Sequence, residues 1–171
     1  MKKIKQYIIP VSISLLLLTF VVISVVNLFY RSKVTTGRMI AAEVVQLHDI
    51  FQRIHRTCQI IDFDYQKNRI NFLNVKSFTG SEVGPMNLVH PNKWEGSYLE
   101  DNPTIQGIEY QIVRTKKGYF ITPGDKVKLP NDKIVGKDII LDEDADITAM
   151  MHNENMMMFE RRPLAMPLTL K

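Results

Sequence analysis

The feature that most constrains this chain is an uncharged apolar segment near its N-terminus. Residues 6–30 contain no Asp, Glu, Lys or Arg and are rich in Ile, Val, Leu and Phe. Roughly 20 apolar residues in a helix are enough to cross the hydrocarbon core of a bilayer. A cleavable secretory signal is the alternative, but its apolar core normally spans about 7 to 15 residues and ends in a small-residue cleavage site. No such site follows Tyr30, so the segment predicts an uncleaved transmembrane helix.

Basic residues on both sides of this segment leave its orientation weakly specified. Three lysines precede it, and further basic residues follow it closely. A short basic tail is typical of the start of a signal-anchor. We therefore expect residues 1–6 in the cytoplasm, residues 7–30 in the membrane and residues 31–171 on the extracytoplasmic side.

Charge and cysteine content exclude several kinds of site. Without the three tail lysines the 22 basic residues fall to 19, against 18 acidic ones. A nearly neutral remainder offers no basic stripe for a phosphate backbone, so we expect no nucleic-acid partner. Cys58 is the only cysteine, which excludes an internal disulfide and a multi-cysteine zinc site.

Apolar residues recur at helical spacing after the membrane segment. The steps alternate between four and three residues, which is the pattern of one buried stripe along a helix. We expect an amphipathic helix over about residues 36–60 that continues the membrane helix, with a looser turn near residues 35–37. The stripe has to cover something apolar, either a sheet or partner helices, and we favour a sheet of the same domain. Its residues are Ile40, Val44, Leu47, Phe51, Ile54 and Cys58.

A change of period to two after residue 60 predicts antiparallel strands. Residues 61–65 and 70–75 alternate apolar and polar side chains around a Lys-Asn pair, which predicts a first hairpin. Residues 108–113 and 119–122 flank a Lys-Lys-Gly turn and predict a second hairpin.

The fold expected from these elements is α+β. A transmembrane helix continues into an amphipathic helix, which packs on a small antiparallel β-sheet. We expect a β-rich part over about residues 61–147, with an irregular loop at residues 79–103 and a further turn at residues 130–132. Residues 148–171 form a Met-rich tail. One domain of this size can bury a single core.

Several short segments carry a family resemblance. Residues 94–99 read Trp-Glu-Gly-Ser-Tyr-Leu, residues 124–125 read Gly-Asp, and residues 144–147 read Asp-Ala-Asp-Ile. They are similar to the W-x-G-P-Y-L segment, the S-x-G-x-D turn and the N-A-D-I segment of the major pseudopilin of bacterial type II secretion and its pilin-like relatives. The matching structural positions are Trp94, Gly96, Tyr98, Leu99 and Gly124.

The resemblance implies a pilin-like fold and a structural role rather than an enzymatic one. It predicts a subunit of a type II secretion pseudopilus or a related pilus-like filament that supports protein export. The protein would be anchored in the bacterial inner membrane, with its C-terminal domain in the periplasm. The implied partners are membrane lipid, further copies of the chain, and other pseudopilins or secretion-system components. The chain has no Gly before Gly37 and no acidic residue before Glu43, so it lacks the prepilin cleavage motif of the family.

An acidic stretch is the candidate metal site. Residues 138–146 hold five carboxylates, whose mutual repulsion favours a bound cation, and calcium prefers oxygen ligands. A solvated acidic loop without a metal is the alternative. The resemblance implies that the calcium ligands are among Asp125, Asp132, Asp144 and Asp146.

Other functions receive less support from the sequence. No phosphate-binding, dinucleotide-binding or nucleophile-elbow glycine pattern occurs, so we do not expect an enzyme. The Met-rich tail offers soft ligands for Cu(I), although Met also fills apolar gaps. The alternative to a filament subunit is a single-pass membrane-anchored binding module that does not polymerise.

Overall fold

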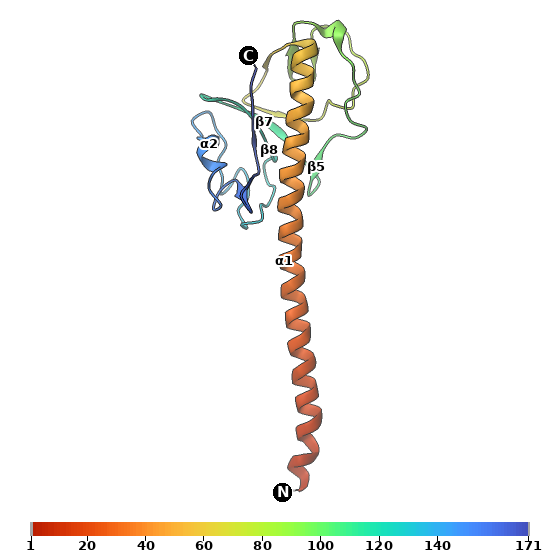
Figure 1. The fold of residues 1–171 in the computed structure, drawn as a ribbon, viewed down its shortest axis with the longest axis vertical. Helices are drawn as coiled ribbons and strands as arrows, with labels where there is room; N and C mark the ends of the chain where they lie inside the picture. Colours follow the sequence, from red (N-terminus) through yellow and green to blue (C-terminus); the bar gives the residue numbers. More distant parts are fainter. Residues whose placement is uncertain (1, 171) are drawn as a thin grey trace. The chain divides into compact units, whose positions relative to one another are not determined.

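The structure is a computed structural model that describes residues 2–170, with side-chain environments from Pro10 onward. Helix α1 (Lys2–Cys58) is its longest element, and the chain divides within this helix into two compact units, Met1–Thr35 and Thr36–Lys171 (Figure 1). The fold of the described residues is α+β, as predicted, with one long apolar N-terminal helix and small antiparallel sheets.

The first unit is the N-terminal part of α1, and its apolar side chains have no protein cover. The large apolar side chains between Val11 and Tyr30 are each 45–69% exposed. Among the described residues, α1 is the helix that is long and apolar enough to cross a membrane. Because a helix satisfies its own backbone hydrogen bonds, such a segment is compatible with a hydrocarbon surrounding.

The second unit is built around the remainder of α1. All six residues of the predicted stripe are at most 1% exposed. Phe51 packs edge-on against both Phe63 and Phe72, with ring centroids 6.1 Å apart in each case. The helix ends at Cys58, and Gln59 follows in the left-handed conformation with φ 57° while its N–H donates to His55 O. That arrangement is a common way to close a helix C-terminus.

Gly37 lies inside α1 at a close packing contact. A Cβ atom at this position would come within 2.3 Å of the Phe159 ring. The helix is continuous through residues 35–37, so the expectation of a looser turn there is wrong. The glycine makes room for an aromatic side chain instead of loosening the helix.

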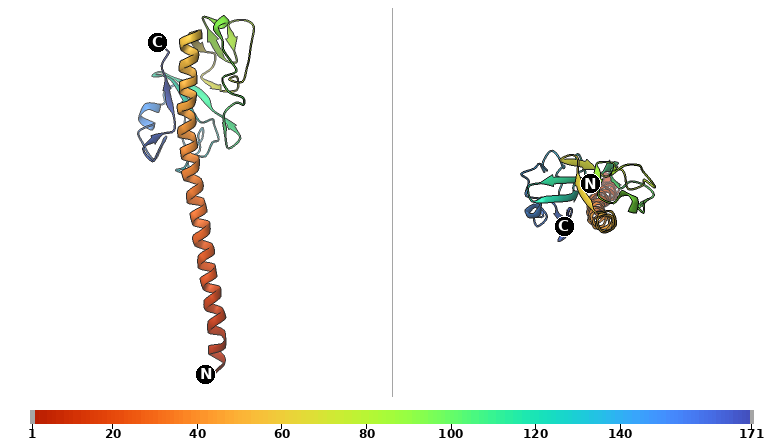
Figure 2. Two further views of the ribbon diagram at one scale, coloured as in Figure 1. Left: turned by 45° about the vertical axis from the view of Figure 1, so that its right-hand side comes forward. Right: turned by 90° about the horizontal axis from the view of Figure 1, so that it is seen from above.

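The main sheet has the strand order β11-β8-β7-β2, with every neighbouring pair antiparallel. In Figure 2, β7 and β8 lie beside the C-terminal turns of α1. The second predicted hairpin is confirmed, because β7 and β8 pair with Lys116 and Lys117 in the turn between them. The four strands are β2 (Lys67–Arg69), β7 (Gln111–Thr115), β8 (Gly118–Thr122) and β11 (Met166–Leu168).

Smaller elements complete the second unit. A three-stranded sheet has the order β1-β4-β3, and two hairpins pair β5 with β6 and β9 with β10. Several of these elements lie within the stretch expected to be an irregular loop. Their bounds are β1 (Ile60–Phe63), β3 (Glu82–Val83), β4 (Met86–Leu88), β5 (Thr104–Ile105), β6 (Ile108–Glu109), β9 (Met158–Phe159), β10 (Arg162–Pro163), the 3-10 helix η1 (Pro91–Lys93) and α2 (Ile147–Met150).

The first predicted hairpin is wrong. β1 pairs with β4, and β2 pairs with β7, so the two strands do not pair with each other. The cause is Asn68, which is 1% exposed and bonds through its side chain to both the N–H and the C=O of Tyr65. These bonds close the turn before Lys67, so the Lys-Asn pair begins a strand instead of forming the turn.

The Met-rich tail is part of the folded domain. β11 adds to the edge of β8, with Met166 opposite Ile121. Met157, Leu164 and Ala165 are fully buried. Met157 therefore fills apolar space, as the flexible thioether side chain commonly does.

Replacing Phe51 with Ala should lower the free energy of unfolding by about 3–5 kcal/mol, because it leaves a cavity between two aromatic rings. Denaturant unfolding of the full chain in detergent micelles, followed by fluorescence of Trp94, the only tryptophan, would measure this loss. Val45→Ala is the control on the same helix, since Val45 is 44% exposed and should cost less than about 0.5 kcal/mol. Equal losses would contradict the assigned core face.

Candidate functional site

The Trp94–Leu99 segment is fastened to the domain through its aromatic side chains and backbone. The Trp94 indole N–H donates to the Val75 carbonyl over 3.0 Å. Its ring packs edge-on against Phe78 and Tyr98, with centroids 5.4 Å and 4.9 Å away. Such pairs add stability beyond the area that they bury.

Gly96 leaves space for this arrangement. A Cβ atom on Gly96 would lie 2.3 Å from Trp94 Nε1 and 2.4 Å from the Val75 oxygen, which are the two atoms of that hydrogen bond. The peptide bond between Gly96 and Ser97 is cis. Beyond it, the Tyr98 N–H donates to Leu73 O over 2.9 Å, which places Tyr98 and Leu99 beside the helix.

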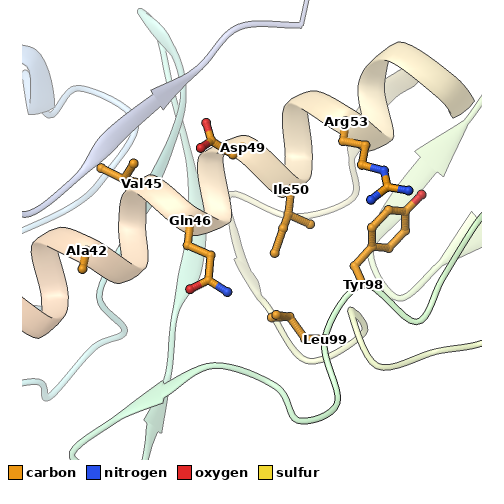
Figure 3. Close-up of a pocket in the computed structure, with 8 residues that line it drawn as sticks. All are labelled: Ala42, Val45, Gln46, Asp49, Ile50, Arg53, Tyr98 and Leu99. Atoms are coloured by element: carbon orange, nitrogen blue, oxygen red, sulfur yellow. The ribbon is translucent and has the colours of Figure 1, made fainter.

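A groove of about 510 Å³ lies between one face of α1 and this segment. Figure 3 shows Gln46 and Ile50 pointing from the helix toward Leu99, with Arg53 directed at the Tyr98 ring. Its lining combines apolar side chains with polar groups that remain open to solvent. The lining residues are Ala42, Val45, Gln46, Asp49, Ile50, Arg53, Tyr98 and Leu99.

Arg53 closes one end of the groove. Its guanidinium donates to Glu95 Oε2 over 2.9 Å and lies 5.6 Å from the Tyr98 ring centroid, within cation–π range. The hydrogen bond to Glu95 raises the pKa of Arg53, and burial raises the pKa of Tyr98. At neutral pH this end of the groove therefore presents a charge-balanced ion pair and a neutral phenol.

The groove lining is mixed in polarity. Its titratable groups are Asp49, Arg53 and Tyr98, and its lining includes no Ser, Cys, His or Lys. Apolar floors with polar rims are typical of surfaces that receive apolar side chains of a partner. An extended or helical segment could place one or two such side chains between Ile50 and Leu99.

The predicted motif residues occupy different places in the fold. Tyr98 and Leu99 line the groove, and Trp94 and Gly96 lie behind them in the same segment, with the Trp94 ring against Tyr98. Gly124 lies elsewhere, where a Cβ atom would meet the Glu109 carbonyl at 2.2 Å. The six stripe residues of α1 lie in the core on the buried face of the helix.

The four candidate calcium ligands are not gathered into one site. Each forms an ion pair with a lysine. Across residues 2–170, no three Asp, Glu, His or Cys side chains are grouped so that they could hold a metal ion. Calcium binding stays a prediction from the sequence.

Sequence reasoning did not identify the helix side of the groove. Ala42, Val45, Asp49 and Arg53 follow one another at steps of three or four, which is a second stripe along the same helix. Its mixed polarity conceals it beside the strongly apolar core stripe. The partners on the loop side become visible only when the Trp94 segment is folded against the helix.

No protein-family model, curated protein or solved structure matches this chain.

Replacing Gly96 with Ala should destabilise the domain by about 1–3 kcal/mol, the usual cost of overpacking, because the new methyl group collides with the Trp94–Val75 hydrogen bond. Thermal unfolding and the emission maximum of Trp94 would report the loss and the exposure of the indole. Ser97→Ala changes an exposed neighbour and should leave both readings unchanged. If Gly96→Ala changed neither the unfolding temperature nor the emission maximum of Trp94, the segment would be able to move without a loss of stability.

Proposed function

We propose that this chain is a single-pass membrane-anchored subunit of a pilus-like filament, of the kind that type II secretion pseudopilins form. The observation that carries this proposal is the first half of α1, whose large apolar side chains are 45–69% exposed between Val11 and Tyr30. An apolar surface of this extent has to be covered by lipid or by other apolar helices. Both kinds of cover are available in a bilayer, where such anchors can also associate side by side.

The chemistry of the second unit supports a structural role. The groove beside the Trp94–Leu99 segment has apolar side chains in its lining, and Arg53 at its edge is paired with Glu95. The core of the second unit is anchored on the same helix that carries the apolar segment. A load passed along α1 in such a filament would therefore reach the second unit through side chains of its core.

A second copy of the chain is the occupant that we propose for the groove. Arg53 is paired with Glu95, and Asp49 is the other acidic side chain of the groove, so its few charges are of mixed sign and a largely apolar surface suits it better than a highly charged ligand. Anchored copies would share one membrane, which raises the effective concentration of one copy near the groove of another. We also propose that the anchor lies in the bacterial inner membrane and the second unit in the periplasm. Further proposed partners are other pseudopilins and secretion-system components.

Membrane anchoring can be tested by alkaline extraction. The full chain should remain in the membrane pellet after carbonate treatment, because the exposed apolar residues of α1 are stable only in hydrocarbon. Removing residues 6–30 should transfer the protein to the soluble fraction. Release of the full chain by carbonate, or a mature form that begins after residue 30, would contradict the anchor.

Association through the groove can be tested by cross-linking in membranes. Val45→Lys should reduce the ladder of cross-linked oligomers by about tenfold or more, because it places a charge in a surface that association would dehydrate. Ile140→Lys is the matched control, since Ile140 is 52% exposed but lies outside the groove. If the natural chain stayed monomeric after cross-linking, the non-polymerising binding module would be favoured. If Val45→Lys and Ile140→Lys gave the same amounts of cross-linked oligomers, the contact would lie outside the groove.

A further inference from the structure

The four carboxylates that the sequence predicts as metal ligands form ion pairs with lysine side chains. Asp125, Asp132, Asp144 and Asp146 are each paired with a lysine of the same chain. We propose that these lysines, instead of a calcium ion, neutralise the four carboxylates. We further propose that they fasten two acidic turns, the one with Asp125 and the one with Asp144 and Asp146, to the main sheet. This role of the lysines is independent of the proposed filament function.

Lys67 on β2 makes the least exposed of these contacts. Its ammonium lies 2.9 Å from Asp125 Oδ2 and 3.1 Å from Oδ1, so it bridges both oxygens. The buried Gln111 amide donates to Oδ1 as well, over 3.4 Å. Gly136 makes room for the carboxylate, because a Cβ atom there would lie 2.9 Å from Asp125 Cγ. The Asp125 carboxylate therefore already has nitrogen donors on both oxygens.

Lys116 and Lys117 form the turn between β7 and β8 and reach the acidic stretch together. Lys116 Nζ donates to Asp144, and Lys117 Nζ donates to Asp146. The Lys116 N–H also donates to Glu143 O over 2.9 Å. The hydrogen bond from Lys117 is the main reason that the pKa of Asp146 is lowered. One two-residue turn thus contacts two carboxylates and the backbone carbonyl of the residue just before the first of them.

The other partners of the acidic turns are also supplied by the chain. Lys128 Nζ lies 2.9 Å from Oδ1 of Asp132, which follows it by four residues in the chain. The Asp138 carboxylate accepts from the Ile134 N–H over 2.8 Å, and Asp142 accepts from the Asp144 N–H over 3.1 Å. Repulsion within the acidic stretch is therefore relieved by lysines and backbone N–H groups.

These donors fit a calcium ion poorly. Calcium takes six to eight oxygen ligands at about 2.3–2.6 Å, and ligands from separate turns would have to converge to supply them. Within residues 2–170 no three acidic, His or Cys side chains converge in this way. A calcium ion at Asp125 would also have to displace the Lys67 ammonium and leave it beside a second cation, which like-charge repulsion opposes.

The first test is the thermal unfolding of the full natural chain in detergent micelles, with EDTA and with about 1 mM calcium, a concentration that fills weak extracellular calcium sites. We expect the same Tm in both, because the carboxylates are already neutralised. A higher Tm in calcium that Asp125→Asn or Asp146→Asn removes would overturn the proposal. Equal Tm values of the natural chain in EDTA and in calcium would show that its stability does not depend on calcium.

The second test removes single lysine charges. Lys67→Gln should lower Tm by about 1–4 °C, as expected for loss of one partly exposed ion pair in a domain of this size. Lys137→Gln is the matched control, because Lys137 is exposed and forms no ion pair within the described residues, and its Tm should change by less than about 1 °C. Adding Asp125→Asn to Lys67→Gln should cause little further loss, since the two side chains act as a pair. Equal Tm values for the two lysine variants would overturn the role of Lys67.

Discussion

Burial of one face of α1 is the interaction on which the second unit depends. The strands around it are two to five residues long, and two of the sheets contain only two strands among the described residues. Isolated sheets of this size are marginally stable in water. They persist because the stripe that includes Phe51 and Ile54 joins their apolar faces into one core. Gly37 extends that face to the Phe159 ring, so the C-terminal segment packs on the same helix as the central strands.

The same helix meets two different requirements along its length. From Val11 to Tyr30 its large side chains are apolar on every face, whereas beyond Gly37 one buried stripe is accompanied by polar and charged positions. Apolar residues on all sides suit a hydrocarbon surrounding, and a single stripe suits a protein core. Both properties belong to local stretches of sequence. The sequence therefore predicts the helix, its core face and the β7–β8 hairpin, whose turn joins strands that are adjacent in the chain.

Contacts between distant residues account for what the sequence did not predict. The alternating residues after Cys58 predict strands but not their partners, and Asn68 moves the turn so that β1 and β2 join different sheets. β11 contains Pro167 and lacks the alternating pattern of a strand, so its pairing with β8 depends on tertiary contacts. The lysine partners of the acidic residues are equally remote, since Lys67 and Asp125 are 58 positions apart. Carboxylates that are clustered in the sequence suggest a metal site, because the sequence does not show that distant lysines lie next to them in the fold.

In the proposed filament, membrane anchoring and contact through the groove would support each other energetically. The groove is small, and an interface built around it would bury little apolar area, so in dilute solution its affinity would be at the millimolar level, about −4 kcal/mol. Confinement of two partners near one another can raise their effective concentration to about the same level. A contact that is weak between free domains can then be well populated between anchored ones, with further contribution from packing of the apolar helices. In the proposed filament, an apolar segment that confines the chain and a weak contact through the groove would together be sufficient for reversible assembly.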